Sequence, residues 1–170
     1  MNVTFHTIGS FAAAAILSLK KTENWRSLSA LKKYLIGFAA GIIVHGVLDL
    51  LPHQYPIPSK VDVIVAPILL VLFLLASQKQ NFLLILICFA GCVFPDVIDL
   101  GPTIVDKYLR IVLPRLPFRL FPWHTVKYSG SIYDGSRGLE SAVYHISFLL
   151  ICFSLIYVYR KSVFKFWENK

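Results

Sequence analysis

Charged residues are scarce in this 170-residue chain: Asp, Glu, Lys and Arg make up 15% of it, whereas apolar residues make up 56%. So little charge excludes an ordinary soluble domain and suits a compact bundle of membrane helices. We therefore expect an all-α fold, a polytopic membrane helix bundle that forms one integral membrane domain over residues 1–170.

The pattern of a secretory signal peptide is also missing, since no basic region precedes a short apolar core and a small-residue cleavage site. We expect the first apolar segment to be kept as a span. Only three cysteines occur, Cys88, Cys92 and Cys152, all in apolar runs. Cys88 and Cys92 are one helical turn apart, which does not suit a disulfide, so packing is the expected role of the cysteines.

Acidic residues are fewer than basic ones, which leaves a net charge of +8. Such a charge is also found in proteins that bind nucleic acid. Here the basic residues lie mainly beside apolar segments, where the headgroups of anionic lipids are nearer. We expect membrane lipids as partners and no nucleic acid.

Five segments have the apolarity and approximate length of membrane spans, which need about 20 residues each. They are residues 3–19, 34–51, 61–77, 82–100 and 139–159. The first is rich in alanine and suits close packing, although read alone it also suits an interfacial helix. The connection 101–138 contains an amphipathic stretch, 104–113, that we expect to lie as a helix in the membrane interface.

This threading puts the N-terminus and the connection 101–138 on one side of the membrane and the C-terminus on the other. Ten of the 17 Lys and Arg residues fall on the side of the C-terminus. Basic residues favour the cytoplasmic side. We therefore expect an integral protein of the bacterial inner membrane with a cytoplasmic C-terminus.

Ionisable groups gather where two of the spans end. His45 and Asp49 are four residues apart and follow two glycines on the same helix face, so they point into the bundle. Asp96 and Asp99 close the fourth span in the same way, three residues apart. The same half of the bundle holds every histidine: His6, His45, His53, His124 and His145.

Imidazole and carboxylate groups without a thiolate are ligands for zinc, manganese or iron. We expect one or two divalent ions, with zinc and manganese preferred. The candidate metal ligands are His6, His45, Asp49, His53, Asp96, Asp99 and His124. Asp49 and Asp96 are also the candidate catalytic carboxylates. On the connection, Arg110, Arg115 and Arg119 are candidates for binding a substrate phosphate.

Three segments carry a resemblance to a known family: Thr4 to Gly9, His45 to His53, and Gly91 to Asp99. The second has the pattern His-x-x-x-Asp-x-x-Pro-His and the third begins Gly-x-x-x-Pro-Asp. Over roughly its first hundred residues the chain resembles small bacterial membrane proteins described as membrane-bound metal-dependent hydrolases. The resemblance implies His6, His45, Asp49, His53 and Asp96 as ligand positions.

Two functions stay open. The first is a membrane-embedded metal-dependent hydrolase that cleaves a phosphoester or related bond of a lipid-like substrate. The second is a non-catalytic accessory subunit that docks to a larger membrane complex through the basic connection and the aromatic residues 164–167. In that case His45 and Asp49 only join helices by a hydrogen bond, and His53 and His124 are plain interfacial residues. Ion translocation does not suit a polar cluster on one side of the membrane.

Overall fold

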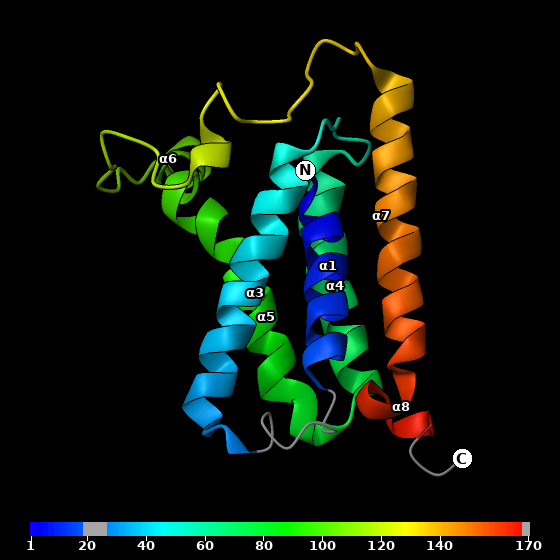
Figure 1. Ribbon diagram of the computed structural model, residues 1–170. Helices are drawn as coiled ribbons and strands as arrows, with labels where there is room; N and C mark the ends of the chain where they lie inside the picture. The colour runs from blue at the N-terminus through cyan, green and yellow to red at the C-terminus, as the bar shows by residue number, and fades with distance from the viewer. Residues whose placement is uncertain (19–26, 168–170) are drawn as a thin grey trace.

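The computed structural model describes residues 1–18 and 27–167, and every regular element in those residues is a helix (Figure 1). The long helices are α1 (Val3–Leu17), α3 (Ala30–Leu50), α4 (Ser59–Ala76), α5 (Phe82–Asp99) and α7 (Gly138–Val158). The short ones are α6 (Gly101–Leu109), α8 (Arg160–Val163), η1 (Lys79–Asn81), η2 (Pro122–His124) and η3 (Lys165–Trp167). The predicted all-helical fold is confirmed.

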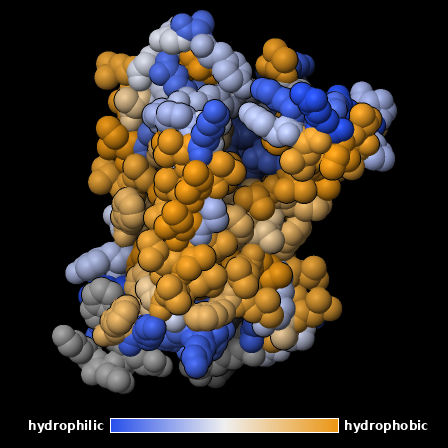
Figure 2. All heavy atoms as spheres, turned by 180° about the vertical axis from the view of Figure 1, so that it is seen from behind, coloured by the Kyte–Doolittle hydropathy of each residue, from blue (hydrophilic) through white to orange (hydrophobic). Residues whose placement is uncertain are grey.

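Among the described residues, four helical segments are long and apolar enough to cross a membrane, which indicates a membrane protein. They are α3, α4, α7 and the continuous segment of η1 and α5, Lys79–Asp99. Helix α1 has 15 residues, fewer than a span needs, so the predicted number of five spans is not confirmed. On the face seen in Figure 2, apolar side chains cover the middle of the molecule and hydrophilic ones lie mainly toward its two ends.

Helix α1 lies in the middle of the bundle, in contact with α3, α4, α5 and α7 (Figure 1). Most of its side chains are buried, and Phe11 and Ala14 join the apolar core formed with α5. Small residues bring its neighbours close: a Cβ atom built on Gly9 would lie 2.6 Å from the side chain of Val44. The segment predicted least clearly as a span is therefore the centre of the fold.

A buried carboxylate on α4 fixes the beginning of α1. Asp62 accepts hydrogen bonds from the backbone N–H groups of Val3 and Thr4, at 2.7 and 2.8 Å. These N–H groups have no partner inside the helix, so the carboxylate acts as an N-terminal cap from outside. The side chain of Asn2 adds two hydrogen bonds with the backbone of Ile57, at 2.8 and 3.2 Å. The first turn of α1 is therefore held firmly at one end of the bundle.

Helices α3 and α5 cross with their backbones in contact. A Cβ atom on Gly41 would lie 2.2 Å from the carbonyl oxygen of Cys88, and one on Gly91 would lie 2.1 Å from that of Phe38. No side chain fits at either position without moving a helix backbone. Because this crossing is four residues before His45 on α3 and five residues before Asp96 on α5, it sets the spacing of the groups described below.

The connection after α5 forms an α-helix only at its start, and the 3-10 turn η2 follows later. Helix α6 ends at Leu109, and Arg110 has a left-handed conformation with φ 56°. The second half of the predicted helix 104–113 is therefore wrong. The cause is Pro114, which has no N–H to donate and favours an extended conformation at the preceding residue. Placement of this segment in a membrane interface stays a prediction.

The chain ends are arranged as the threading predicted. The N-terminus, the loop 51–58 and the connection 101–137 lie at one end of the bundle, and the turn 77–81 and the C-terminal residues lie at the other (Figure 1). At this second end the backbone N–H of Gln78 donates to the carbonyl of Val163 at 2.8 Å. Phe164 packs edge-on against Phe73, with ring centroids 5.2 Å apart.

Candidate metal centre

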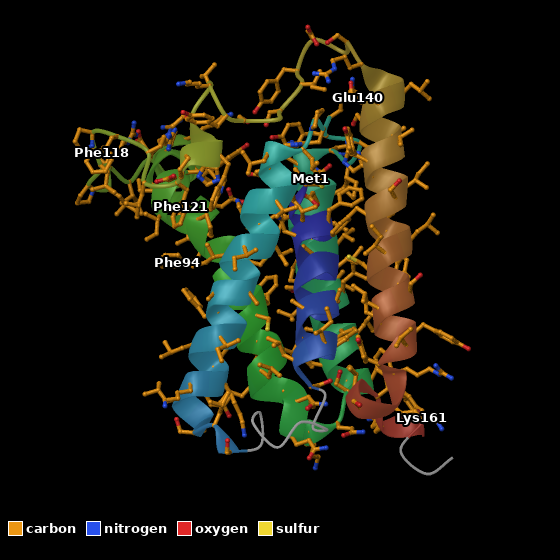
Figure 3. The ribbon with its side chains drawn as sticks, viewed as in Figure 1. Met1, Phe94, Phe118, Phe121, Glu140 and Lys161 are labelled. Carbon is orange, nitrogen blue, oxygen red and sulfur yellow. The ribbon has the colours of Figure 1, made fainter. Side chains whose placement is uncertain are left out.

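Two helix ends and one 3-10 turn bring the site together. Helix α3 contributes His45 and Asp49, helix α5 contributes Asp96 and Asp99, and η2 contributes His124. The two pairs predicted from their i, i+4 and i, i+3 spacing therefore lie at the same end of the bundle, as the Gly41–Gly91 crossing requires. Figure 3 shows Phe94 and Phe121, from α5 and the chain before η2, lying side by side at this end of α5, with rings 6.1 Å apart.

Asp99 anchors the chain that carries His124. Its carboxylate accepts hydrogen bonds from the backbone N–H groups of Leu120 and Phe121, at 2.9 and 3.0 Å, and from Nδ1 of His124 at 2.9 Å. The Asp99 side chain is fully buried. Asp99 is thus a partner of a ligand candidate rather than one of the converging donors, although it was predicted as a ligand.

A flat contact between Trp123 and α3 completes the docking of η2. A Cβ atom on Gly46 would lie 2.8 to 2.9 Å from three carbon atoms of the indole ring. Only glycine therefore lets the ring lie against the helix. The next chain segment is held as well, since the backbone N–H of Gly130 donates to the carbonyl of Asp49 at 2.7 Å.

Four donor atoms converge: Nε2 of His45, Nε2 of His124, and one oxygen each of Asp49 and Asp96. The His45 nitrogen lies 3.2 Å from Asp49 Oδ2 and from the His124 nitrogen, and 3.7 Å from Asp96 Oδ1. The His124 nitrogen lies 3.5 Å from Asp49 Oδ2 and 3.2 Å from Asp96 Oδ1. In a tetrahedral zinc site with bonds of about 2.0–2.2 Å, ligand atoms are about 3.3–3.6 Å apart. The donor set therefore has the dimensions of a metal site.

The hydrogen bonds of the two histidines show which nitrogen faces the centre as an acceptor. Nδ1 of His45 lies 2.6 Å from the carbonyl oxygen of Cys92, which can only accept, so Nδ1 carries the proton. Nδ1 of His124 donates to Asp99 in the same way. Metal-binding histidines usually make this outer hydrogen bond. Both Nε2 atoms then present lone pairs to each other and to two carboxylate oxygens.

The net charge of the cluster also favours a bound cation. The cluster contains three carboxylates, Asp49, Asp96 and Asp99, and one cation, the ammonium group of Met1, which lies 2.6 Å from Asp49 Oδ1. With neutral histidines the sum is two negative charges in a largely buried place, which is unfavourable unless a cation balances them. One divalent ion would do so.

His124 can also hold a proton when no ion is bound. Burial lowers its pKa, but hydrogen bonds with Asp49, Asp96 and Asp99 outweigh this effect and raise the pKa to about 10. A metal ion would therefore displace a proton from this ring at neutral pH.

Access to the centre is from the side of Asp96, whose side chain is 27% exposed, compared with 11% for Asp49 and 4% for His124. The side chain of His45 is completely enclosed. A substrate or water molecule would therefore reach the four donors past Asp96.

His6 is close to the centre but not one of the four converging donors. Its ring stacks on that of His45 with centroids 4.2 Å apart, and its Nε2 atom lies 3.2 Å from Asp49 Oδ1. His6 therefore lies near the centre, as predicted, but it contacts Oδ1 of Asp49, the oxygen that is not among the four donors.

The structure does not place His53 with these groups. Its Nδ1 atom donates to the carbonyl of Leu51 at 2.7 Å, and its Nε2 atom lies 3.3 Å from the hydroxyl groups of Tyr55 and Ser131. Burial lowers its pKa to about 4, so the ring is neutral at pH 7. His53 forms a separate hydrogen-bonded network that joins the loop after α3 to the connection, because Pro52 ends the helix and turns the chain away from Asp49.

Only two of the three arginines predicted to bind phosphate lie together. Arg115 and Arg119 line a cavity of about 290 Å³ next to Asp99, with Thr103 and Phe118. Arg115 also pairs with Asp106. Arg110 ends α6 in its left-handed conformation and does not line this cavity.

Sequence reasoning missed three contributors to the centre: the amino group of Met1, the carbonyl of Cys92 and the ring of Trp123. The only signal was for Trp123, which precedes a candidate ligand directly. A backbone carbonyl leaves no trace in the residue type, and Cys92 was predicted to serve packing alone.

The fold and this cluster describe a helical membrane protein with a candidate His/Asp metal centre. In comparisons with known proteins, no family model, no curated protein and no solved structure matches the chain. The chemistry of the centre is therefore the basis for a function.

Proposed function

We propose that this protein is a membrane-embedded metal-dependent hydrolase that binds a divalent ion at His45, Asp49, Asp96 and His124. One observation carries the proposal: two imidazole Nε2 atoms and two carboxylate oxygens meet within 4.8 Å, and all four are acceptors once His124 releases the proton that it holds without an ion. Acceptors repel one another unless a proton or a cation lies between them. Zinc and manganese suit this mixed nitrogen and oxygen set.

A bound ion of this kind lowers the pKa of its water to about 7, which supplies a nucleophile at neutral pH. The protein residues hold and shield the reacting groups. Asp49 is enclosed and fixes the donor arrangement. Asp96 is the most exposed of the four, so it is the carboxylate that can meet substrate and take up a proton.

The substrate we propose is the phosphoester, or a related bond, of a lipid-like molecule. Arg115 and Arg119 line the cavity beside Asp99, and an arginine side chain can bind phosphate through two parallel hydrogen bonds. Asp99 in turn holds His124, so this cavity lies one side chain away from the centre. The cavity is at the end of the bundle where apolar segments meet polar groups, a place that a lipid headgroup can reach.

On the charge count given above, we place the protein in a bacterial inner membrane with the C-terminus in the cytoplasm. The candidate centre is at the end of the bundle opposite the C-terminal residues (Figure 1). It would then face the outer side of that membrane. The accessory-subunit alternative used residues 164–167 for docking, but Phe164 packs against Phe73 of the same chain.

Metal content tests the proposal. Protein purified in detergent without a chelator or a metal-affinity step is expected to contain zinc or manganese by elemental analysis. Asp49→Asn should remove it, because Asn keeps the volume but takes away an anionic ligand. Glu140→Gln is the control: Glu140 is another carboxylate at this end of the bundle (Figure 3), but it pairs with Arg137 and should not affect metal content.

Activity gives the second half of the test. Hydrolysis of bis(4-nitrophenyl) phosphate is expected for the wild type and the Glu140→Gln variant and not for Asp49→Asn. Wild-type protein that holds no metal, and that added zinc or manganese does not stabilise, would favour the accessory-subunit alternative instead.

A further inference from the structure

Asp49 presents its two carboxylate oxygens to different neighbours. Oδ2 faces Nε2 of His45 and of His124, at 3.2 and 3.5 Å. Oδ1 faces Nε2 of His6 at 3.2 Å and the amino nitrogen of Met1 at 2.6 Å. The second oxygen therefore takes no part in the four-donor centre and is directed to a position of its own.

His6 is the residue without an explained role at this position. Its side chain is 1% exposed, and neither of its ring nitrogens has a hydrogen-bond partner among residues 1–18 and 27–167. Nε2 is close to Asp49 Oδ1, but the contact lacks the geometry of a hydrogen bond. A buried imidazole nitrogen without a partner is unfavourable. A cation beside Nε2 and Oδ1 would satisfy both atoms.

Another group of donors near His6 does not offer a better place. Atoms of His6, His45 and Cys92 lie within 4.8 Å of one another. Nδ1 of His45 already donates to the carbonyl of Cys92 at 2.6 Å, and the thiol of Cys92 donates to the carbonyl of His6 at 3.2 Å. Two of the three donors are thus engaged, so the position beside Asp49 remains.

We propose that a second divalent cation binds between Nε2 of His6 and Oδ1 of Asp49, so that Asp49 bridges two ions. The 3.2 Å between these atoms equals the shortest separations in the four-donor centre. Ions on the two oxygens of one carboxylate suit the separation of about 3.5–4 Å found in two-metal hydrolases. The inference rests on the proposed function, because Asp49 is shared with the first ion.

The Met1 ammonium group shows that Oδ1 already faces a positive charge. The position beside Oδ1 therefore already suits a cation.

Manganese loading of the full-length protein in detergent tests the inference. The protein is stripped with a chelator, desalted, loaded with MnCl₂ and desalted again, and bound manganese is counted by elemental analysis. Wild type should hold two ions per chain and give the exchange-coupled electron paramagnetic resonance signal of neighbouring Mn²⁺ ions. His6→Phe keeps an aromatic ring on His45 but removes both nitrogens. It should hold one ion and give the six-line signal of an isolated Mn²⁺.

His145→Phe is the matched control. His145 is also a buried histidine, but its Nδ1 atom donates to the carbonyl of Ser141 on its own helix, so this variant should still bind two ions. A wild type with one isolated ion would overturn the second site and leave the proposed function standing, whereas a wild type with none would overturn both. If His6→Phe does not fold, the spectrum of the loaded wild type decides alone.

Discussion

Gly46→Ala should weaken metal binding although Gly46 is not a ligand. The new Cβ atom would lie 2.8 to 2.9 Å from three ring carbons of Trp123. Carbon atoms in contact are about 3.5–4.0 Å apart, so the ring has to move by about 0.6–1.2 Å. His124 follows Trp123 directly, and metal–ligand distances tolerate only about 0.2 Å. The substitution therefore displaces one of the four donors.

The expected loss can be bounded. Disturbing the support of a ligand usually lowers metal affinity about 10- to 100-fold, which corresponds to about 1.4–2.8 kcal/mol. Overpacking itself should lower the free energy of unfolding of the metal-free protein by about 1–3 kcal/mol. Competition with a chromogenic chelator measures affinity for zinc, and thermal unfolding in detergent measures stability.

Gly37→Ala separates these two effects. It makes the same substitution in the same helix, but its Cβ atom would meet the side-chain ends of Leu84, Cys88 and Ile87, at 3.0, 3.3 and 3.6 Å, and not the ring of Trp123. Its affinity for zinc should equal that of the wild type. The reasoning is refuted if Gly46→Ala binds zinc as tightly as the wild type, or if Gly37→Ala loses as much affinity as Gly46→Ala.

Three further outcomes are expected. Asp99→Asn should lower zinc affinity about 10- to 100-fold, because the tautomer of His124 is then no longer fixed by a carboxylate; unchanged affinity would contradict this role. Zinc affinity should rise about tenfold per pH unit between pH 6 and 8, because His124 in the metal-free protein has a pKa of about 10 and must lose a proton when zinc binds. Zinc titrations at three pH values measure this dependence, and an affinity that does not change with pH would show that His124 holds no such proton. Gly91→Ala should lower both thermal stability and zinc affinity, because its Cβ atom would lie 2.1 Å from the carbonyl of Phe38 and force α3 and α5 apart.

The parts of the site that follow from helical periodicity were predictable. His45 with Asp49, and Asp96 with Asp99, are pairs within one helix, so their spacing fixes a common face. Hydropathy then places the ends of both helices at one depth. The role of Asp99, which holds His124 by a hydrogen bond and is not one of the four donors, was not predictable. It depends on the backbone N–H groups of Leu120 and Phe121, which come from a distant segment.

The position of His53 could not be derived from its place in the motif. A residue just after a helix-ending proline can turn toward the helix axis or away from it, and the decision depends on the partners available. Here the partners are Tyr55 and Ser131, and Ser131 is far along the chain. The central position of α1 was equally hidden, since an alanine-rich segment is compatible with a buried helix and with an interfacial one.

The central position of α1 has a consequence for the order in which the molecule is built. During synthesis α1 emerges before α3, α4, α5 and α7, the helices that later enclose it. Thr7 and Ser10, fully buried in the finished fold, are then without these neighbours. The donors of the metal centre come from chain segments that are translated one after another, and His124 comes last. The metal ion would therefore bind late in biogenesis, after α1 and the helices that carry the other donors have been translated.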